Sequence, residues 1–391
     1  MSDNSNIIGN NSIIINNSKG FNATFEMISL HNLNTLDVND CIDINVGDSQ
    51  IPVFFGLEEV IDTNYFVSPV QKMLFQRLCG MALRRGLKFT EEGNLIPMDF
   101  EIQEIYEEVV KYNVTDSYVA FEKEIISTFN SMSKIKVCVD VEREHINDDG
   151  ELIEEKNMTF QPLLNTEIKV KSQKHKYTHK TVKKTYVSLK SLPLIWAVTT
   201  KSNSEMLYLK KDLFNFKGFE IKTDDIKKIP SRESIEYQAL KECIAHEILS
   251  RKNWLKVNHL IKDGKKGSYK LAYPKNTTKE KWEKFRKISF ETILKDMYIL
   301  DENSNLTEKY KIIDETDENG KPIIFTADEI EKKLFKREDN IKTSYKNQVI
   351  SILAAFKEKG FIDDYYEYKT NSKFAGWIVD PSVKYDRLVI E

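Results

Sequence analysis

The 391-residue sequence predicts an α+β protein, on three observations. Apolar residues recur at helical spacing behind serine and threonine capping positions. Other segments alternate apolar and polar residues, as strands with one buried face do. Both ends of the chain also show the same succession of helix, short strand, helix, helix and hairpin. With 40% apolar residues the chain can bury real cores, and its length allows two or three domains.

The first succession begins at Ser68. Pro69 suits a first helical position and Gln71 completes a capping box, so we expect a helix through SPVQKMLFQRLCGMALRRG. The turn Glu91-Glu92-Gly93-Asn94 follows the helix. The later elements expected here are a strand over 95–100, helices over 101–112 and from the capping Asp116, and a hairpin of strands 135–141 and 152–160.

The second succession occupies the C-terminal part of the chain. Thr277 and Glu280 predict a helix start, and Thr326 with Glu329 predicts another. Gly360 ends the last helix. The elements expected here are a helix over 277–294, a strand over 321–326, helices over 328–335 and 342–359, and a hairpin of strands 361–368 and 373–379.

Each succession describes a winged helix, in which the hairpin is the wing. The predicted architecture is two winged-helix domains joined by a basic β-hairpin and a long-helix region, the long helix covering 231–251. Three parts are expected. They are a disordered Asn/Ser-rich tail over 1–20, an N-terminal winged-helix domain with the hairpin extension and linking helix over 21–250, and a C-terminal winged-helix domain over 251–391.

Charge is distributed very unevenly along the chain. Residues 1–150 hold 11 Lys/Arg against 24 Asp/Glu, whereas residues 168–300 hold 31 against 14, a net charge of +17. The net charge of −3 for the whole protein hides this basic third, which can attract a polyanion. Lysine makes up 49 of the 58 basic residues, which favours phosphate contacts over bidentate base reading, although an AT-rich genome also favours lysine.

The strongest feature is an acid-free run over 168–204 that carries nine lysines and two histidines. Its core, TEIKVKSQKHKYTHKTVKKTYVSL, predicts a β-hairpin with a Lys/His-rich tip. A second basic block over 251–287 predicts another hairpin with a positive turn. Tyrosine and tryptophan interleave with its lysines, either as core residues or as stacking surfaces. The phosphate contacts expected from the two blocks are Lys169, Lys171, Lys174, Lys176, Lys180, Lys183, Lys184, Lys256, Lys262, Lys265, Lys266 and Lys270.

The two expected third helices differ in chemistry. A recognition helix uses its N-terminal side chains on base edges in the major groove. In the C-terminal domain these are Ser344, Lys346 and Asn347, with Lys369 and Lys373 on the wing beside the phosphates, unless the helix merely presents a solvated face. In the N-terminal domain they include Glu122 and Glu124, which would repel phosphate. That helix is expected to have a structural or protein-binding role.

Enzymatic and metal-binding patterns are absent from the sequence. No phosphate-binding loop with GxxxxGK[ST] spacing and no CxxC pair occurs. His175, Tyr177 and His179 could suggest a metal-dependent nickase, but a hairpin tip offers no outer shell to hold both imidazoles. No membrane-spanning or secretory segment is evident. We expect a cytoplasmic, non-enzymatic protein without cofactor or metal.

This organisation resembles the replication initiators of low-GC bacterial plasmids, which have tandem winged-helix domains. The closest local likeness is SPVQKMLFQRLCGMALRRG followed by EEGNLIPMDFEIQEIYEEV and a third helix. The resemblance implies binding of double-stranded origin repeats, opening of adjacent AT-rich DNA and recruitment of the host replicative helicase or its loader. The acidic N-terminal third helix departs from a DNA-reading domain and favours a homodimer contact. The alternatives are a transcriptional regulator, a DNA nickase or recombinase, and an RNA-binding protein.

Overall fold

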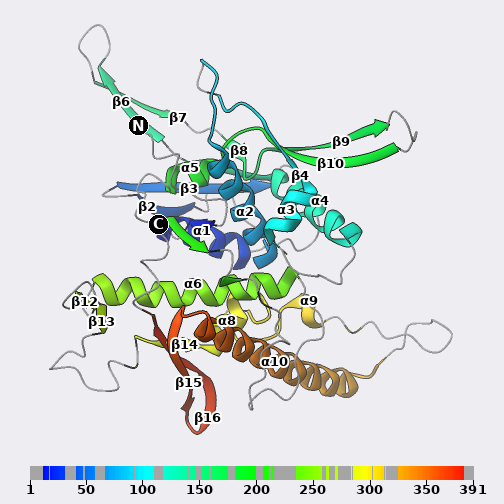
Figure 1. Ribbon diagram of the computed structural model, residues 1–391, viewed down its shortest axis with the longest axis vertical. Coiled ribbons are helices and arrows are strands. Elements are labelled where there is room, and N and C mark those ends of the chain that lie inside the picture. The colour runs from blue at the N-terminus through cyan, green and yellow to red at the C-terminus, as the bar shows by residue number, and fades with distance from the viewer. Residues whose placement is uncertain are drawn as a thin grey trace. The chain divides into compact units, whose positions relative to one another are not determined.

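The chain forms two compact units, Met1–Lys211 and Asp212–Glu391, each described here by itself (Figure 1). Both mix helices with small antiparallel sheets, so the predicted α+β class is confirmed. The computed structural model describes residues 12–16, 18–30, 41–46, 49–57, 67–91, 94–109, 118–139, 141–146, 152–157, 160–174, 181–199, 206–210, 213–214, 216, 235–257, 261–263, 269–271, 283, 285–301, 303–311, 313 and 325–382.

The first unit contains five of the labelled helices and eleven strands. Its helices are α1 (Lys19–Leu30), α2 (Pro69–Arg85), α3 (Ile102–Val109), α4 (Tyr118–Lys134) and α5 (Leu194–Thr199). Its strands are β1 (Ser12–Asn16), β2 (Cys41–Val46), β3 (Ser49–Leu57), β4 (Met98–Glu101), β5 (Ile135–Val139), β6 (Val141–Ile146), β7 (Leu152–Asn157), β8 (Phe160–Pro162), β9 (Thr166–Lys174), β10 (Thr181–Leu189) and β11 (Met206–Lys210).

Strand pairing in the first unit corrects the predicted wing. The segments expected to form it, β5 and β7, do not pair: β5 lies between β3 and β8 in a four-stranded sheet, and β7 pairs with β6. The strand that follows α2, β4, pairs instead with β10 of the basic hairpin, in the sheet order β4-β10-β9. Alternation along β5 fits any half-buried strand, so the sequence could not select its partners.

The core of the first unit is built around an aromatic cluster. Phe21 and Phe25 of α1 lie 4.7 Å apart between ring centroids, and Phe75 of α2 lies 5.2 Å from Phe25. Trp196 of α5 meets Phe21 edge-on at 5.7 Å. All four side chains are buried, so this cluster fixes α1, α2 and α5 together.

Order begins earlier than the expected tail of 20 residues allows. Ser12–Asn16 forms β1, which pairs with β11, and Ile13, Ile14 and Ile15 are buried. A Cβ on Gly80 would lie 3.2 Å from the carbonyl oxygen of Ile14, so α2 packs closely on this strand. The Asn/Ser composition misled the prediction because the three isoleucines form a strand only with a partner about 190 residues away in the chain.

The second unit has one three-stranded sheet and one small hairpin among its described residues. The sheet order is β14-β16-β15, the same first-third-second order as β4-β10-β9. Its elements are α6 (Ile235–Val257), β12 (Ile261–Asp263), β13 (Tyr269–Leu271), β14 (Lys287–Ser289), α8 (Phe290–Asp296), α9 (Glu308–Lys311), α10 (Ala327–Glu358), β15 (Ile362–Thr370) and β16 (Lys373–Pro381).

Three predicted elements of the second unit are corrected. The strand β14 interrupts the helix expected over 277–294, and residues 321–324 of the strand expected over 321–326 lie outside the described residues. The helices expected over 328–335 and 342–359 are one helix, α10. The second basic hairpin is shorter than expected, because residues 254–257 continue α6.

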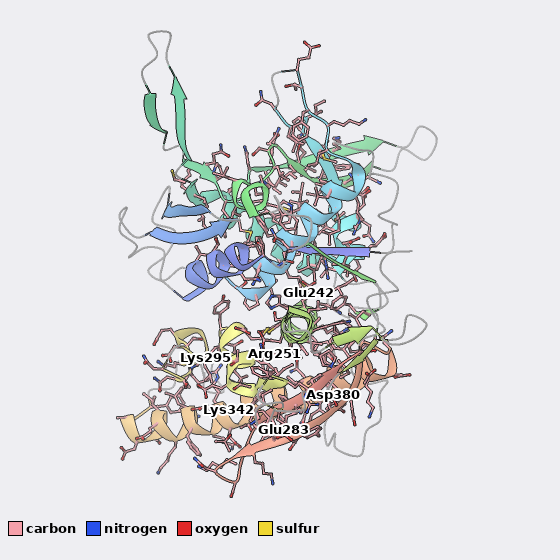
Figure 2. All side chains as sticks on the ribbon, turned by 90° about the vertical axis from the view of Figure 1, so that its left-hand side faces the viewer. Glu242, Arg251, Glu283, Lys295, Lys342 and Asp380 are labelled. Carbon is pink, nitrogen blue, oxygen red and sulfur yellow. The ribbon has the colours of Figure 1, made fainter. Side chains whose placement is uncertain are left out.

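The long helix α6 organises the second unit. The expected domain boundary at residue 250 falls inside α6, which belongs wholly to this unit. The ammonium of the buried Lys241 donates to the carbonyl oxygens of Phe214 (3.1 Å) and Phe216 (2.7 Å). Arg251 donates to the carbonyl oxygen of Lys287 at 3.1 Å, which ties α6 to β14 (Figure 2).

The hairpin β15–β16 ends in a tight turn, as predicted. Asn371 and Ser372 have φ values of 52° and 65°, the left-handed values that a two-residue hairpin turn requires. Gly376 has a φ of 152°, and a Cβ there would lie 2.2 Å from the carbonyl oxygen of Ile288. Glycine at this position therefore lets β16 approach β14 closely.

Candidate nucleic-acid interface

The basic hairpin β9–β10 has two nine-residue strands, paired from Thr166 with Leu189 to Lys174 with Thr181. The third strand, β4, pairs only with the base of the hairpin, from Tyr186 to Leu189. The distal part is therefore a two-stranded ribbon among the described residues. Lys183 lies on this ribbon and is exposed. Lys174 ends β9, while Lys176 and Lys180 lie outside the described residues.

The register separates the lysines of the hairpin onto two faces. Lys184 pairs directly with Lys171, and Tyr186 pairs with Lys169, so these residues share one face. The same face carries Asp99, because β4 adds its own side chains at matching positions. Val187 and Leu189, on the opposite face, are fully buried. The polar face of the sheet thus combines lysines with carboxylates from a distant part of the chain.

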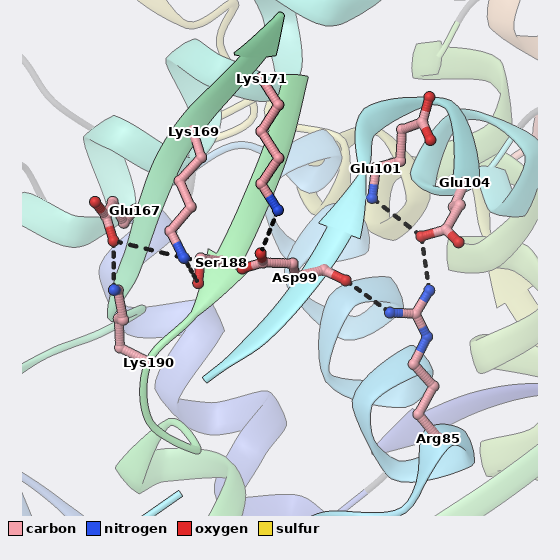
Figure 3. A network of polar contacts seen from close by, with 9 residues as sticks. All are labelled: Arg85, Asp99, Glu101, Glu104, Glu167, Lys169, Lys171, Ser188 and Lys190. Atoms are coloured by element: carbon pink, nitrogen blue, oxygen red, sulfur yellow. Dashed lines mark hydrogen bonds and ion pairs between the residues drawn. The ribbon is translucent and has the colours of Figure 1, made fainter. Parts of the chain in front are cut away.

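Lys169 and Lys171 share the carboxylate of Asp99. Their ammonium nitrogens lie 3.0 Å and 3.1 Å from its two oxygens, and Lys169 also donates to Ser188 at 3.0 Å (Figure 3). Hydrogen bonds from Ser188, Lys169 and Lys171 lower the pKa of Asp99 to about 2. Lys171 also lies over the ring of Tyr186 at 4.6 Å. Asp99 is therefore ionised at neutral pH and holds both lysines against the sheet.

Further pairs extend this network at the base of the hairpin. Lys184 pairs with Glu101 at 2.9 Å, and this hydrogen bond raises the pKa of Lys184. Arg85 pairs with Glu104 at 2.6 Å, and Lys190 binds Glu167 (Figure 3). The network contains five cations and four carboxylates, namely Arg85, Lys169, Lys171, Lys184 and Lys190 with Asp99, Glu101, Glu104 and Glu167. The base of the hairpin is therefore nearly neutral, although the sequence run itself lacks acids.

The second basic block is less completely described. Lys256 lies in α6, and Lys262 and Lys270 occupy directly paired positions on β12 and β13. Lys265 and Lys266 lie outside the described residues.

The second unit brings its predicted residues together on α10 and the hairpin β15–β16. Ser344 is exposed and Asn347 is half-buried, one turn apart on α10. Lys346 pairs with Glu367 of β15 at 2.8 Å and lies 3.8 Å from the ring centroid of Phe374. Lys369 and Lys373 are exposed beside the turn, with no ion pair to any described residue.

The continuity of α10 adds basic residues that were not predicted. Lys333, Lys336 and Arg337 fall at helical spacing on the same face as Ser344 and Asn347. The prediction missed them because it divided this region into two helices. The absence of glycine and proline over 327–359 was the signal that a single helix could continue.

The third helix of the first unit keeps the predicted acidic character. Glu124 of α4 is exposed, and Glu122 is half-buried. Phe121, Ile125 and Phe129 of the same helix are buried, so the carboxylates lie on its outer side. This surface would repel phosphate.

No described group of three or more His, Cys, Asp or Glu side chains could hold a metal ion, and His175 and His179 lie outside the described part. None of the described helices has the length and apolar character needed to cross a membrane. Comparisons with family models, with curated proteins and with solved structures found no match to this chain.

Proposed function

We propose that the protein is a sequence-specific, double-stranded DNA-binding protein built from two winged helices. The observation that carries this proposal is the repeated topology. In each unit a helix, a short strand, two further helices and a hairpin occur in this chain order, and the strands of the sheet order first-third-second. Other elements lie between them, namely β5 to β8 in the first unit and β12, β13 and α9 in the second. In this proposal the corresponding elements are α2, β4, α3, α4 and β9–β10 in the first unit, and α6, β14, α8, α10 and β15–β16 in the second.

Base reading is assigned to the second unit. The exposed Ser344 and the half-buried Asn347 face outward on α10, and short polar side chains of this kind can hydrogen-bond to base edges in the major groove. Lys369 and Lys373 on the hairpin turn are placed to contact phosphates beside the groove. The acidic α4 of the first unit is assigned to a protein contact, with a second copy of the chain as the partner.

Phosphate binding by the first unit is assigned to the distal part of the basic hairpin. The lysines at or next to the base, Lys169, Lys171 and Lys184, are already paired with carboxylates. This leaves Lys183 and Lys174 on the described part of the ribbon, together with Lys176 and Lys180, which follow Lys174 in the sequence and lie outside the described residues. This division narrows the set of hairpin lysines that the sequence predicts to contact phosphate.

The biological role that fits best is initiation of plasmid replication. A protein with two DNA-binding units and a basic projecting hairpin can hold iterated origin repeats and the DNA beside them. Recruitment of the host replicative helicase or its loader then follows from the likeness to plasmid initiators. Direct repeats in the DNA flanking its own gene would be the sites bound.

Gel shifts with this flanking DNA test the proposal. A distal variant in which Lys174, Lys176, Lys180 and Lys183 are glutamine should bind all duplexes more weakly. The slope of log affinity against log salt should fall by about 3 to 4, because each phosphate contact contributes about 0.9. In the matched control, Lys169, Lys171 and Lys184 are replaced with glutamine. This control should change the slope of log affinity against log salt by less than about 1.

Failure of the wild-type protein to shift the flanking DNA at low salt would refute DNA binding. Equal effects of the distal and control variants would refute the assigned division of the hairpin. Nicking of supercoiled plasmid in the presence of Mg²⁺, abolished by Tyr177→Phe, would instead establish the nickase alternative.

A further inference from the structure

A cavity of about 580 Å³ lies in the second unit between the start of α8, the middle of α10 and the hairpin β15–β16. Its volume falls within the range of small-molecule sites. Phe290 and Phe374 line one side, and Lys342 and Lys346 line another.

The aromatic side of the cavity is firmly supported. The rings of Phe290 and Phe374 lie 5.5 Å apart between centroids. Behind them the fully buried Trp377 contacts both rings, at 5.6 Å and 4.9 Å. Phe290 and Phe374 themselves are only half-buried, so they present ring surface to the cavity. Half-buried phenyl rings on a rigid base are suited to stacking with a flat ring of a ligand.

The cationic side of the cavity comes from one face of α10. Lys342 and Lys346 are one helical turn apart, and Lys342 lies at the middle of α10 (labelled in Figure 2). Lys342 pairs with Glu338 at 2.5 Å and Lys346 pairs with Glu367 at 2.8 Å. All four side chains are partly exposed, and such pairs contribute little free energy. An incoming phosphate can therefore share or replace the carboxylate partners.

Polar groups complete the lining. Thr343 and Thr370 provide hydroxyl donors and acceptors. Glu291 also lines the cavity, and hydrogen bonds from Ser304 and Lys295 lower its pKa, so it stays ionised. Its carboxylate can accept from the N–H groups of a base, whereas it would repel a phosphate. The cavity thus combines an acceptor for a base with cations for a phosphate, and the charge of Lys342 also helps to lower the pKa of Glu291.

We propose that this cavity binds one unstacked nucleotide of single-stranded DNA. The base stacks on Phe290 and Phe374 and displaces the Lys346 ammonium, which lies 3.8 Å from the ring centroid of Phe374. The adjoining phosphate pairs with Lys342 and with the displaced Lys346. The proposal rests on the proposed function as a DNA-binding protein and adds single-stranded DNA as a second ligand. Bases in an intact duplex are paired and stacked, so they cannot enter without being extruded.

Fluorescence anisotropy with a labelled 12-nucleotide oligo(dT) and the full chain tests this. Phe374→Ala should weaken binding of oligo(dT) roughly tenfold, the loss that corresponds to one base–aromatic stack. Binding of duplex DNA should change by less than about twofold, because the duplex does not use the ring. Phe374→Tyr keeps a ring and should retain binding.

The matched control is Phe335→Ala. Phe335 lies on α10, is 76% exposed and does not line the cavity. Replacing its ring with alanine should therefore leave oligo(dT) binding unchanged. An equal loss with Phe335→Ala would overturn the assignment to the cavity. Equal weakening of oligo(dT) and duplex by Phe374→Ala would also overturn it, and would assign the cavity to the duplex backbone.

Two further outcomes separate the proposals. If the wild-type protein binds duplex DNA but not oligo(dT), only the proposed nucleotide site is overturned. If it binds neither ligand, the proposed DNA binding is overturned as well. If Phe374→Ala fails to fold, ultraviolet cross-linking of the wild-type protein to an iodouracil-containing oligonucleotide replaces the variant. Cross-links on the peptides that contain Phe290 or Phe374 support the proposal, and cross-links confined to other peptides overturn it.

Discussion

Each unit has a three-stranded sheet with the strand order first-third-second, yet the hairpins of these two sheets differ in charge. In the first unit the strand beside the hairpin, β4, supplies Asp99 and Glu101, which pair with three hairpin lysines. In the second unit the corresponding strand, β14, is Lys-Ile-Ser and supplies no carboxylate. Lys369 and Lys373 consequently have no acidic partner among the described residues.

This difference shows that the strand next to a hairpin decides which of its cations can reach a ligand. The first hairpin has more lysines, but those at its base are neutralised. The second has few, but those at its turn are exposed. The third helices differ in the same direction, since α4 presents Glu122 and Glu124 whereas α10 presents Ser344 and Asn347.

The largest expected effect concerns the stability of the second unit. In Gly376→Ala the new Cβ would overlap the carbonyl oxygen of Ile288 at 2.2 Å and require a strained φ. We expect a loss of about 3 kcal/mol in the free energy of unfolding. Urea unfolding measures this loss, and hydrogen exchange shows whether it is confined to the second unit.

The comparison change in the first unit is Gly80→Ala, where the nearest backbone atom would lie 3.2 Å away. Alanine has a higher helix propensity than glycine, which offsets the crowding. The free energy of unfolding should therefore change by less than about 1 kcal/mol. A larger loss in Gly80→Ala than in Gly376→Ala would contradict the packing described for β14 and β16.

The next effect concerns which unit reads bases. Replacing Ser344 and Asn347 with alanine should lower the preference for the specific site roughly tenfold or more, since each base contact contributes about 1–3 kcal/mol. Competition gel shifts with specific and random duplexes measure this ratio. Glu122→Gln with Glu124→Gln in the first unit should not lower it. If the first-unit variant loses site preference instead, base reading has been assigned to the wrong unit.

A smaller effect follows from removing the acid at the base of the first hairpin. Asp99→Asn frees Lys169 and Lys171 from their shared partner, so duplex binding should tighten and the salt slope should steepen by about 1 to 2. Binding titrations between low and moderate salt measure the slope. The control is Asp364→Asn, which removes the partner of Lys357 in the second unit and should leave the slope unchanged. An unchanged slope in Asp99→Asn would mean that these lysines lie beyond the reach of DNA.

The smallest effect is a pH dependence of the first unit. The pKa of Asp99 falls from 3.8 to about 2 on folding, so its contribution is present above pH 4 and lost as the pH falls toward 2. After allowance for a side chain that is 31% exposed, this contribution is about 1 kcal/mol. The free energy of unfolding of the wild type and of Asp99→Asn can be measured between pH 2 and 6. The difference between the two values should become smaller below pH 4. A constant difference would contradict the ionised pairing.

Much of the local structure could be predicted from the sequence. The capping box of Ser68 and Gln71 starts α2 as expected, with hydrogen bonds of 2.7 Å and 3.2 Å. The backbone N–H of Thr326 donates to Glu329 at 2.9 Å at the start of α10. These signals depend on residues three positions apart, so no distant part of the chain is needed to interpret them.

The errors have two different causes. The division of α10 was avoidable, because no helix-breaking residue separates 335 from 342. The wing of the first unit was not, because β5 and β10 alternate in the same way. Which of them pairs with β4 depends on long-range packing, in which α3 contacts both β4 and β10. The strand at Ser12–Asn16 was missed for a similar reason, since its partner β11 lies near the end of the same unit.

The sequence by itself determined the α+β class, the positions of most helices and hairpins, and the concentration of positive charge in the middle of the chain. Those properties follow from local spacing, capping and composition. Tertiary structure alone decided which lysines stay available. Asp99 and Lys169 are 70 residues apart, and their pairing follows from the order β4-β10-β9. A count of charges along the sequence does not reveal an ion pair whose two residues are brought to 3.0 Å only by strand pairing.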